Sequence, residues 1–452
     1  MTAGGNLVHL RGAAGMAAIY RKISWHLLPL LILCYIVAYL DRVNISYAQL
    51  QMEQSLEFGE QVYGWGAGLF FIAYLLFEVP SNLMLEKVGV RKTLLRIMLC
   101  WGVVAATGAF VSTPWQFYAM RFALGMFEAG FFPGVILYLT YWYPAARRAK
   151  VVALFGSAVM VASAMAGPLC GAILHYLDHW RGLAGWQWMF IIQGLPAVLL
   201  GIVAYACLPD DPSDADWLTP GEHVLMRQEM QRELALRPPA TRSGMAALLQ
   251  DPVLYLLALA NFLLVAASYA LVLWVPTLMQ SWGMRDLMEL GLYSSLPYIA
   301  GIVGMLAIGR HSDWRRERRW HFAACMFSAA LGLGIVVAAH NGLMLSLAGL
   351  SLALAGIAAA TPLFMTILTE YLEPAQAAAG IALLSSCGIL GGAFSPVVSG
   401  AMLANGATTQ VLGLLITLCL LAGMTLLLAL RKSPIYGDIS EKHYSADNAA
   451  QS

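Results

Sequence analysis

The sequence has 452 residues, of which 60% are apolar and only 11% are charged, and its mean hydropathy is +0.70. A chain with so little polar surface cannot cover a water-soluble domain, which argues against a soluble enzyme. The formal net charge of +1 leaves no basic surface for a nucleic-acid partner. The seven cysteines are single and lie far apart inside apolar runs, which is neither a zinc spacing nor a disulfide framework. We therefore expect no metal site and no cofactor.

Twelve apolar runs are long enough to cross about 30 Å of hydrocarbon as helices. β-Barrel strands alternate at period two in pieces of about ten residues, so these uninterrupted runs predict helices. The first run follows Arg21 and Lys22, is longer than a signal-peptide core and has no cleavage site, so we expect it to be kept as a first span. The predicted spans are residues 23–48, 64–85, 92–111, 115–142, 151–175, 186–208, 252–280, 289–309, 320–340, 343–369, 377–403 and 408–430.

The distribution of lysine and arginine predicts the orientation of these spans, because cytoplasmic loops retain positive charge during insertion. The loops and tails on the side of the N-terminus hold 22 of the 26 basic residues. The opposite loops hold only Arg181 and Arg285. Both termini are therefore predicted to be cytoplasmic.

One long polar segment, residues 209–250, separates spans six and seven and is predicted to be a cytoplasmic linker. Within it, Thr219, Pro220 and Glu222 supply an N-cap, an N1 proline and a capping-box acid, which predicts a surface helix through Arg237. The predicted organisation is a cytoplasmic N-terminal tail (1–22), a six-helix bundle (23–208), the linker, a second six-helix bundle (251–430) and a cytoplasmic C-terminal tail (431–452).

The two predicted bundles resemble each other. The charged segments at 86–92 and 313–319 follow spans two and eight and are 227 residues apart. Gly167-Pro168 in span five and Ser395-Pro396 in span eleven are 228 residues apart. Such a duplication is expected when a substrate site lies between two repeats and is exposed alternately to each side.

Five charged residues fall inside predicted spans, where each costs about 2.5 to 3.5 kcal/mol on insertion scales. They are Asp41, Arg42, Glu78, Arg121 and Glu128. Ion pairing that holds the helices in register is one explanation. The other is a transport site, because a carboxylate near an arginine in a cavity can switch between ionised and protonated forms. The arginines offer forked donors that fit a carboxylate, which favours an organic anion as cargo.

Aromatic and hydroxyl side chains within the spans are further candidates for a cavity wall, although at membrane depth they also serve as packing or interface anchors. These residues are Tyr35, Tyr39, Tyr74, Tyr138, Trp274, Tyr298, Ser385 and Ser386.

The segment at 121–144, which begins Arg-Phe-Ala-Leu-Gly-Met-Phe-Glu, resembles the fourth-span signature of the anion:cation symporter family in the major facilitator superfamily. Leu-Asp-Arg-Val-Asn-Ile-Ser at 40–46, Glu-Val-Pro-Ser-Asn at 78–82 and Ser-Asp-Trp-Arg-Arg at 312–316 are similar to other landmarks of that family. The resemblance covers nearly the whole chain. It implies an all-α membrane protein with twelve transmembrane helices in two six-helix bundles, which imports carboxylates such as sugar acids, hydroxy acids or aromatic acids with protons.

The resemblance also implies roles for individual residues. Asp41 and Glu128 match the family's proton sites, Arg42 and Arg121 match its arginines, and Tyr39 and Tyr74 match its tyrosines in spans one and two. With Trp274 and Ser385 from the second half, these arginines and tyrosines form the predicted substrate-binding set. The family often has asparagines in span eleven where this chain has Ser385 and Ile389, which leaves room for a less hydroxylated or aromatic acid.

The predicted protein is thus a proton-coupled importer of a small organic anion that works as a monomer in the bacterial inner membrane. An organic-anion uniporter or exchanger without proton coupling is the alternative. A nutrient sensor would normally carry a longer signalling tail than the 22 residues after Leu430. A membrane-embedded enzyme would need a catalytic constellation at membrane depth, and the sequence has none there.

Overall fold

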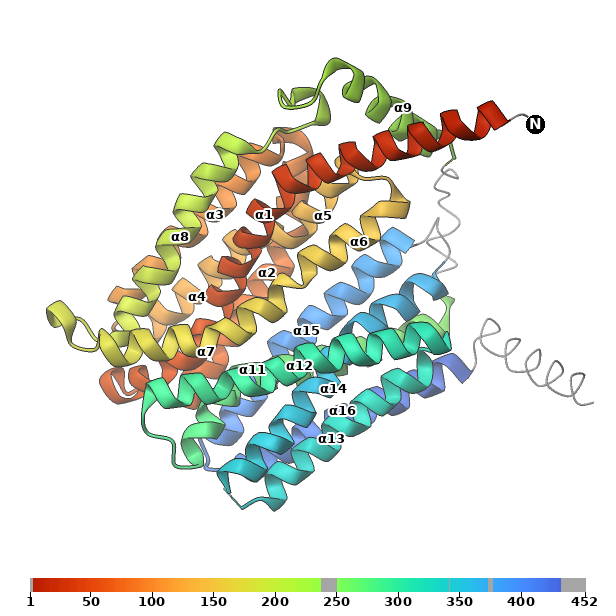
Figure 1. The fold of residues 1–452 in the computed structure, drawn as a ribbon. Helices are drawn as coiled ribbons and strands as arrows, with labels where there is room; N and C mark the ends of the chain where they lie inside the picture. Colours follow the sequence, from red (N-terminus) through yellow and green to blue (C-terminus); the bar gives the residue numbers. More distant parts are fainter. Residues whose placement is uncertain (1–2, 237–249, 341, 373–376, 432–452) are drawn as a thin grey trace, which may run out of the picture.

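The computed structural model describes residues 3–236, 250–340, 342–372 and 377–431, and its regular structure within these ranges is entirely helical (Figure 1). Twelve of its segments are long and apolar enough to cross a membrane, as predicted. The protein is therefore a multi-pass, all-α membrane protein.

The first half contains the six spans that precede the linker. The helices are α1 (Ala3–Leu56), α2 (Glu60–Val88), α3 (Val90–Thr107), α4 (Pro114–Glu128), α5 (Phe131–Trp142), α6 (Ala145–Gly156), α7 (Ala158–Tyr176) and α8 (Gly185–Cys207). Helices α4 and α5 together make the fourth span, and α6 and α7 carry the fifth. Helix α1 begins well before the predicted first span, because residues 3–22 belong to the same continuous helix.

The second half contains six spans, each made by a single unbroken helix. They are α11 (Pro252–Ser281), α12 (Leu287–Arg315), α13 (Arg319–Ala338), α14 (Leu343–Tyr371), α15 (Ala377–Leu403) and α16 (Thr408–Arg431). Helix α12 extends six residues past the predicted end of span eight at residue 309, since its charged last turns can continue the helix beyond the hydrocarbon.

The fourth span is broken in the middle, which the sequence analysis did not predict. Helix α4 ends at Glu128, and Gly130 adopts φ +88°, in the left-handed region that favours glycine. Pro133 then lies in the first turn of α5, where a missing backbone N–H is tolerated. The break places the carboxylate of Glu128 at a helix C-terminus inside the membrane.

The linker helix α9 (Pro220–Leu236) forms as predicted, and Arg237 lies outside the described residues. The Thr219 hydroxyl accepts the backbone N–H of Glu222, and the Glu222 carboxylate accepts the N–H of Thr219 at 2.8 Å. The ammonium of Lys22 also donates to this carboxylate at 2.9 Å. The backbone N–H of Thr219 and the charge of Lys22 lower the pKa of Glu222. These contacts hold α9 against α1, as Figure 1 shows.

The twelve spans form two bundles with equivalent internal packing. In the first, α2 packs on α4 and α3 packs on α8; in the second, α12 packs on α14 and α13 packs on α16. These pairs join spans two and four, three and six, eight and ten, and nine and twelve, so the repeat predicted from sequence is present in the packing. Between the bundles, α2 packs along α15 and α7 along α12.

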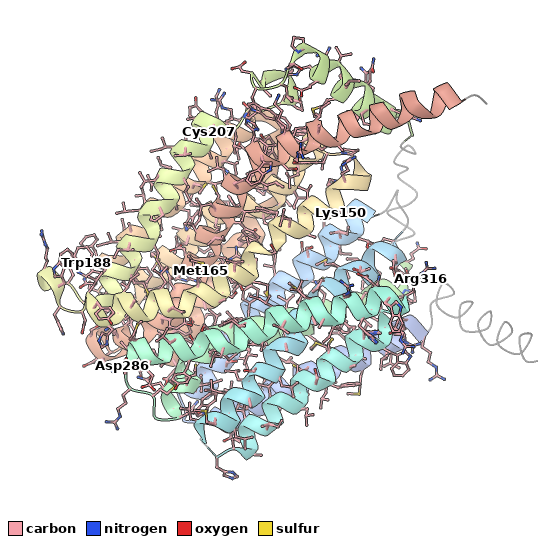
Figure 2. The ribbon with its side chains drawn as sticks, viewed as in Figure 1. Lys150, Met165, Trp188, Cys207, Asp286 and Arg316 are labelled. Carbon is pink, nitrogen blue, oxygen red and sulfur yellow. The ribbon has the colours of Figure 1, made fainter. Side chains whose placement is uncertain are left out.

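The molecule has two distinct ends. Figure 2 shows Lys150, Cys207 and Arg316 at one end and Trp188 and Asp286 at the other. We call the first end the linker face, because α9 lies there, and the second the opposite face.

The bundles are sealed against each other toward the opposite face. A Cβ atom on Gly64 of α2 would lie 2.5 Å from the carbonyl oxygen of Pro396 on α15. A Cβ on Gly167 of α7 would lie 2.1 Å from Oγ of Ser294 on α12. The hydroxyls of Tyr47 and Ser294 add a hydrogen bond of 2.8 Å between the halves. Any side chain larger than hydrogen at these glycines would force the two bundles apart.

Candidate functional site

A cavity of about 540 Å³ lies between the two bundles in the half of the molecule toward the linker face. Its walls include Glu78 and Asn82 near the end of α2 and Ile381 near the start of α15. Because the bundles are sealed toward the opposite face, the cavity is reached from the linker face. The cavity is therefore open to one side of the molecule.

Both halves contribute polar side chains to the cavity wall. Those of the first half are Tyr35, Arg42, Tyr74, Glu78 and Asn82. Those of the second half are Asn261, Tyr269, Thr361, Ser385 and Ser386. The rest of the wall is apolar, with the rings of Phe71 and Phe132 among its members. A compartment of this kind suits a small molecule that has both a polar and an apolar part.

Arg42 joins both halves of the molecule at the cavity wall. Its guanidinium forms an ion pair with the carboxylate of Glu128, from α1 to α4, and donates to the hydroxyl of Tyr269 on α11 at 3.2 Å. It also lies over the rings of Phe70 and Tyr74, 5.4 Å from each centroid. Its side chain is 14% exposed, whereas that of Glu128 is 2% exposed. Arg42 is the one cation in the cavity wall among the described residues.

Glu128 is placed by the break in the fourth span. The unpaired carbonyl groups at the end of α4 give this point a partial negative charge, which adds to the charge of the carboxylate and attracts the guanidinium of Arg42. The Oε2 atom of Glu128 is buried and has no hydrogen-bond partner in the described part of the protein. A buried carboxylate with one unsatisfied oxygen can accept either a proton or a donor group.

Asp41 lies next to Arg42 in sequence but points away from the cavity. Nε1 of Trp101 donates to its Oδ2 at 2.6 Å, and Nδ2 of Asn44 donates to its Oδ1 at 3.1 Å. The residue is 3% exposed. Asp41 therefore has two neutral donors and no ion pair within the ranges that the structure describes.

Arg121 is buried behind the wall of the cavity. Its Nε donates to the carbonyl oxygen of Gly66 at 3.4 Å, and its guanidinium lies 4.8 Å from the ring centroid of Phe70. It is 1% exposed. Arg121 and Glu128 are seven residues apart, a spacing that would place them on one face of a straight helix, but the structure pairs Glu128 with Arg42 from another helix.

The predicted site residues thus divide into two groups. Arg42, Tyr74 and Ser385 line the cavity. Asp41, Glu128, Arg121, Tyr39 and Trp274 are buried outside its wall, and Trp274 packs edge-on against Tyr63 with ring centroids 4.9 Å apart.

Sequence reasoning missed four polar residues of the wall, which are Asn82, Asn261, Tyr269 and Thr361. Two of them lie on α11: the Tyr269 hydroxyl accepts from Arg42 at 3.2 Å, and the Asn261 amide donates to the carbonyl oxygen of Leu384 at 2.7 Å. The available signal for these two was a tyrosine and an asparagine within the apolar run at 252–280, of the same kind that drew attention to Tyr74.

Comparison with known proteins identifies the family. The sequence pattern of the Major Facilitator Superfamily matches residues 31–357. The chain belongs to the major facilitator superfamily.

Three relatives are similar to this chain over most of its length. A "Putative tartrate transporter" of Agrobacterium vitis is 41% identical over 419 residues, covering 92% of each chain. A "Putative metabolite transport protein NicT" of Pseudomonas putida is 36% identical over 416 residues, covering 92% of this chain and 95% of the relative. A "Quinolone resistance transporter" of Acinetobacter baumannii is 39% identical over 380 residues, covering 84% and 87%.

Solved structures share the fold of this major facilitator protein. A D-xylose–proton symporter superposes with a TM-score of 0.71 at 15% identity, covering 89% of this chain and 97% of that one. A bacterial homologue of the human lysosomal transporter Spinster, in an inward-facing and unoccupied conformation, gives 0.71 at 16% identity, covering 90% and 97%. At these identities the likeness establishes the fold, which is two six-helix bundles.

Proposed function

We propose that this protein is a member of the anion:cation symporter family that imports a small organic anion together with protons by alternating access. The observation that carries the proposal is the ion pair of Arg42 and Glu128 at the wall of a cavity between the bundles. The protein works as a monomer in the bacterial inner membrane, with the linker face and both termini in the cytoplasm, as the basic loops indicate.

The cargo is an anion because the cavity presents a guanidinium to it. Arg42 can bind a carboxylate bidentately, and such pairs are strong where water is scarce. The carboxylate of Glu128 is paired with this guanidinium, so it competes with the cargo for the same donor. Tyr74 and Tyr269, which lie next to Arg42, supply hydroxyl groups to the bound anion.

Protonation of Glu128 ends its competition with the cargo for the guanidinium of Arg42. When Glu128 takes up a proton, it loses its charge and releases the guanidinium of Arg42 to the incoming carboxylate. The loaded site is then nearly neutral, which favours movement of the bundles around it. Asp41, with only neutral donors around it, is the second carboxylate that can exchange a proton as water gains access. Arg121, Tyr39, Trp274 and Ser385 complete the proposed substrate-binding set.

The moving bodies are residues 23–208 and 251–430, which the linker at 209–250 joins. The names of two relatives, a putative tartrate transporter and a putative metabolite transport protein, support a metabolite as cargo and a carboxylate in particular. The apolar part of the wall, with Phe71 and Phe132, favours a carboxylate with an apolar or aromatic body over a fully hydroxylated one.

The test begins with a panel of carboxylates and their neutral amides, assayed by thermal shift of the purified protein, since a ligand that binds the folded state raises its stability. The acid that binds is then used for uptake into proteoliposomes under an imposed pH gradient. We expect Asp41→Asn and Glu128→Gln to lose uphill uptake, while at least one of them still exchanges substrate.

Glu289→Gln is the control, because this exposed carboxylate lies at the opposite face in the first turn of α12. Equal binding of acids and amides would contradict the anion site. If both site variants concentrate substrate as the unmodified protein does, the proton site lies elsewhere, with Glu78 the next candidate. A uniporter or an exchanger without proton coupling would show no uphill uptake under the pH gradient, even in the unmodified protein.

A further inference from the structure

Helices α2 and α15 run antiparallel and pack closely in the sealed half of the molecule. A Cβ atom on Gly400 would lie 3.0 Å from Cα of Gly64, and one on Gly68 would lie 2.9 Å from the carbonyl oxygen of Ala393. A Cβ on Gly392 would lie 3.4 Å from the ring of Phe71. Toward the linker face, residue numbers therefore rise along α2 and fall along α15. The register of this pair is fixed where the two helices touch.

The same register continues beyond the contact, where the two helices separate and line the cavity. Seven residues after Phe71 on α2 is Glu78, and seven residues before Gly392 on α15 is Ser385. Two helical turns span about 10 Å along each axis, so these two residues lie at the same depth. Both line the cavity, one from each half of the molecule.

Glu78 and Ser385 have free polar groups in this state. The Glu78 carboxylate makes no hydrogen bond or ion pair within the described ranges, and neither does the Ser385 hydroxyl. The neighbouring Ser386 differs, because its hydroxyl already donates to the carbonyl oxygen of Ala382 at 3.0 Å. A carboxylate and a hydroxyl are complementary, since the hydroxyl donates and the carboxylate accepts.

We infer that Glu78 and Ser385 form the contact that closes the cavity at the linker face when the protein turns its site to the opposite face. Closure continues the packing of α2 on α15 by two turns and brings the Ser385 hydroxyl onto the Glu78 carboxylate. A carboxylate that loses water on closure needs such a donor, because a buried polar group without a partner is costly. The transport role of this contact rests on the proposed alternating access.

Disulfide trapping tests the contact directly. In a variant without the seven native cysteines, the pair Glu78→Cys and Ser385→Cys should cross-link under mild oxidation. The register control is Glu78→Cys with Ile389→Cys, one turn further along α15, which should cross-link at least tenfold more slowly. Adding Gly167→Leu, which wedges the opposite face apart, should accelerate the first cross-link severalfold. Equal rates for the two pairs, or no acceleration by Gly167→Leu, would overturn the inference.

A second measurement separates closure from binding. Without any cargo, Ser385→Ala should lower the labelling rate of a cysteine introduced at the opposite face on the order of tenfold, the value of one hydrogen bond to a charged group, because the state closed at the linker face loses a contact. A role of Ser385 in binding alone would leave this labelling unchanged, and Ser386→Ala should also leave it unchanged. Unchanged labelling of the Ser385→Ala protein would contradict the role of the contact. The cross-link is read by gel without any cargo, so its failure and the failure of the proposed anion transport are independent outcomes.

Discussion

Replacing Arg42 by methionine removes the partner of a buried carboxylate and should destabilise the protein in a pH-dependent way. Glu128 is then left either charged and unpaired or protonated. A glutamate ordinarily has a pKa near 4.3, so protonating it at pH 7 costs about 4 kcal/mol. This cost is the upper limit on the loss of unfolding free energy from the unpaired charge, because Glu128 can always take up a proton instead of staying charged. At pH 5.5 the same step costs about 1.5 kcal/mol. The loss should therefore shrink as the pH falls, because the folded variant binds one more proton than the unfolded chain.

The assay is reversible unfolding by SDS in mixed micelles, followed by the fluorescence of the 13 tryptophans at pH 7 and pH 5.5. The double variant Arg42→Met, Glu128→Gln should regain most of the stability, since no unpaired charge remains, but it should not regain uptake. Arg285→Met, at an exposed position of the opposite face, is the matched control. A loss below about 1 kcal/mol at pH 7, or one that is equal at both pH values, would refute the reasoning.

Three further perturbations follow from the structure. Trp101→Phe removes a donor to the buried carboxylate of Asp41 and should lower the unfolding free energy by about 1.5 to 3 kcal/mol, with a shifted pH profile of uptake. Tyr47→Phe removes the hydrogen bond to Ser294 and should shift the equilibrium about fivefold toward the state open at the opposite face, as measured by the accessibility of a cysteine introduced there. A cysteine introduced at Glu222 should not react with an impermeant reagent in intact cells, and its labelling would overturn the predicted topology.

The spans could be predicted from sequence because the bilayer demands about 20 apolar residues in a row, a property that requires no knowledge of neighbours. The break at Gly130 was missed because α4 and α5 are both apolar and together make one long run. Its signal was present in Ala-Gly-Phe-Phe-Pro-Gly at 129–134, since glycine and proline close together mark a helix break.

The partners of the buried charges could not be predicted in the same way. The seven-residue spacing of Arg121 and Glu128 places them on one helix face two turns apart, which would suggest each as the other's nearest charge. Which arginine reaches Glu128 depends on the rotation of α1 against α4, and that rotation is set by packing over the whole bundle. The contribution of Tyr269 to the site is a contact between the two halves, so neither half contains the information for it alone.

Under the proposed alternating access, closure of the cavity also displaces water. Its 540 Å³ correspond to about 18 water molecules at 30 Å³ each. Closing the walls around a small cargo must return most of this water to the solvent at the linker face. Solutes too large to enter the cavity would draw that water out and favour the closed form, so the resting conformation of the carrier becomes sensitive to the water activity of the compartment it faces.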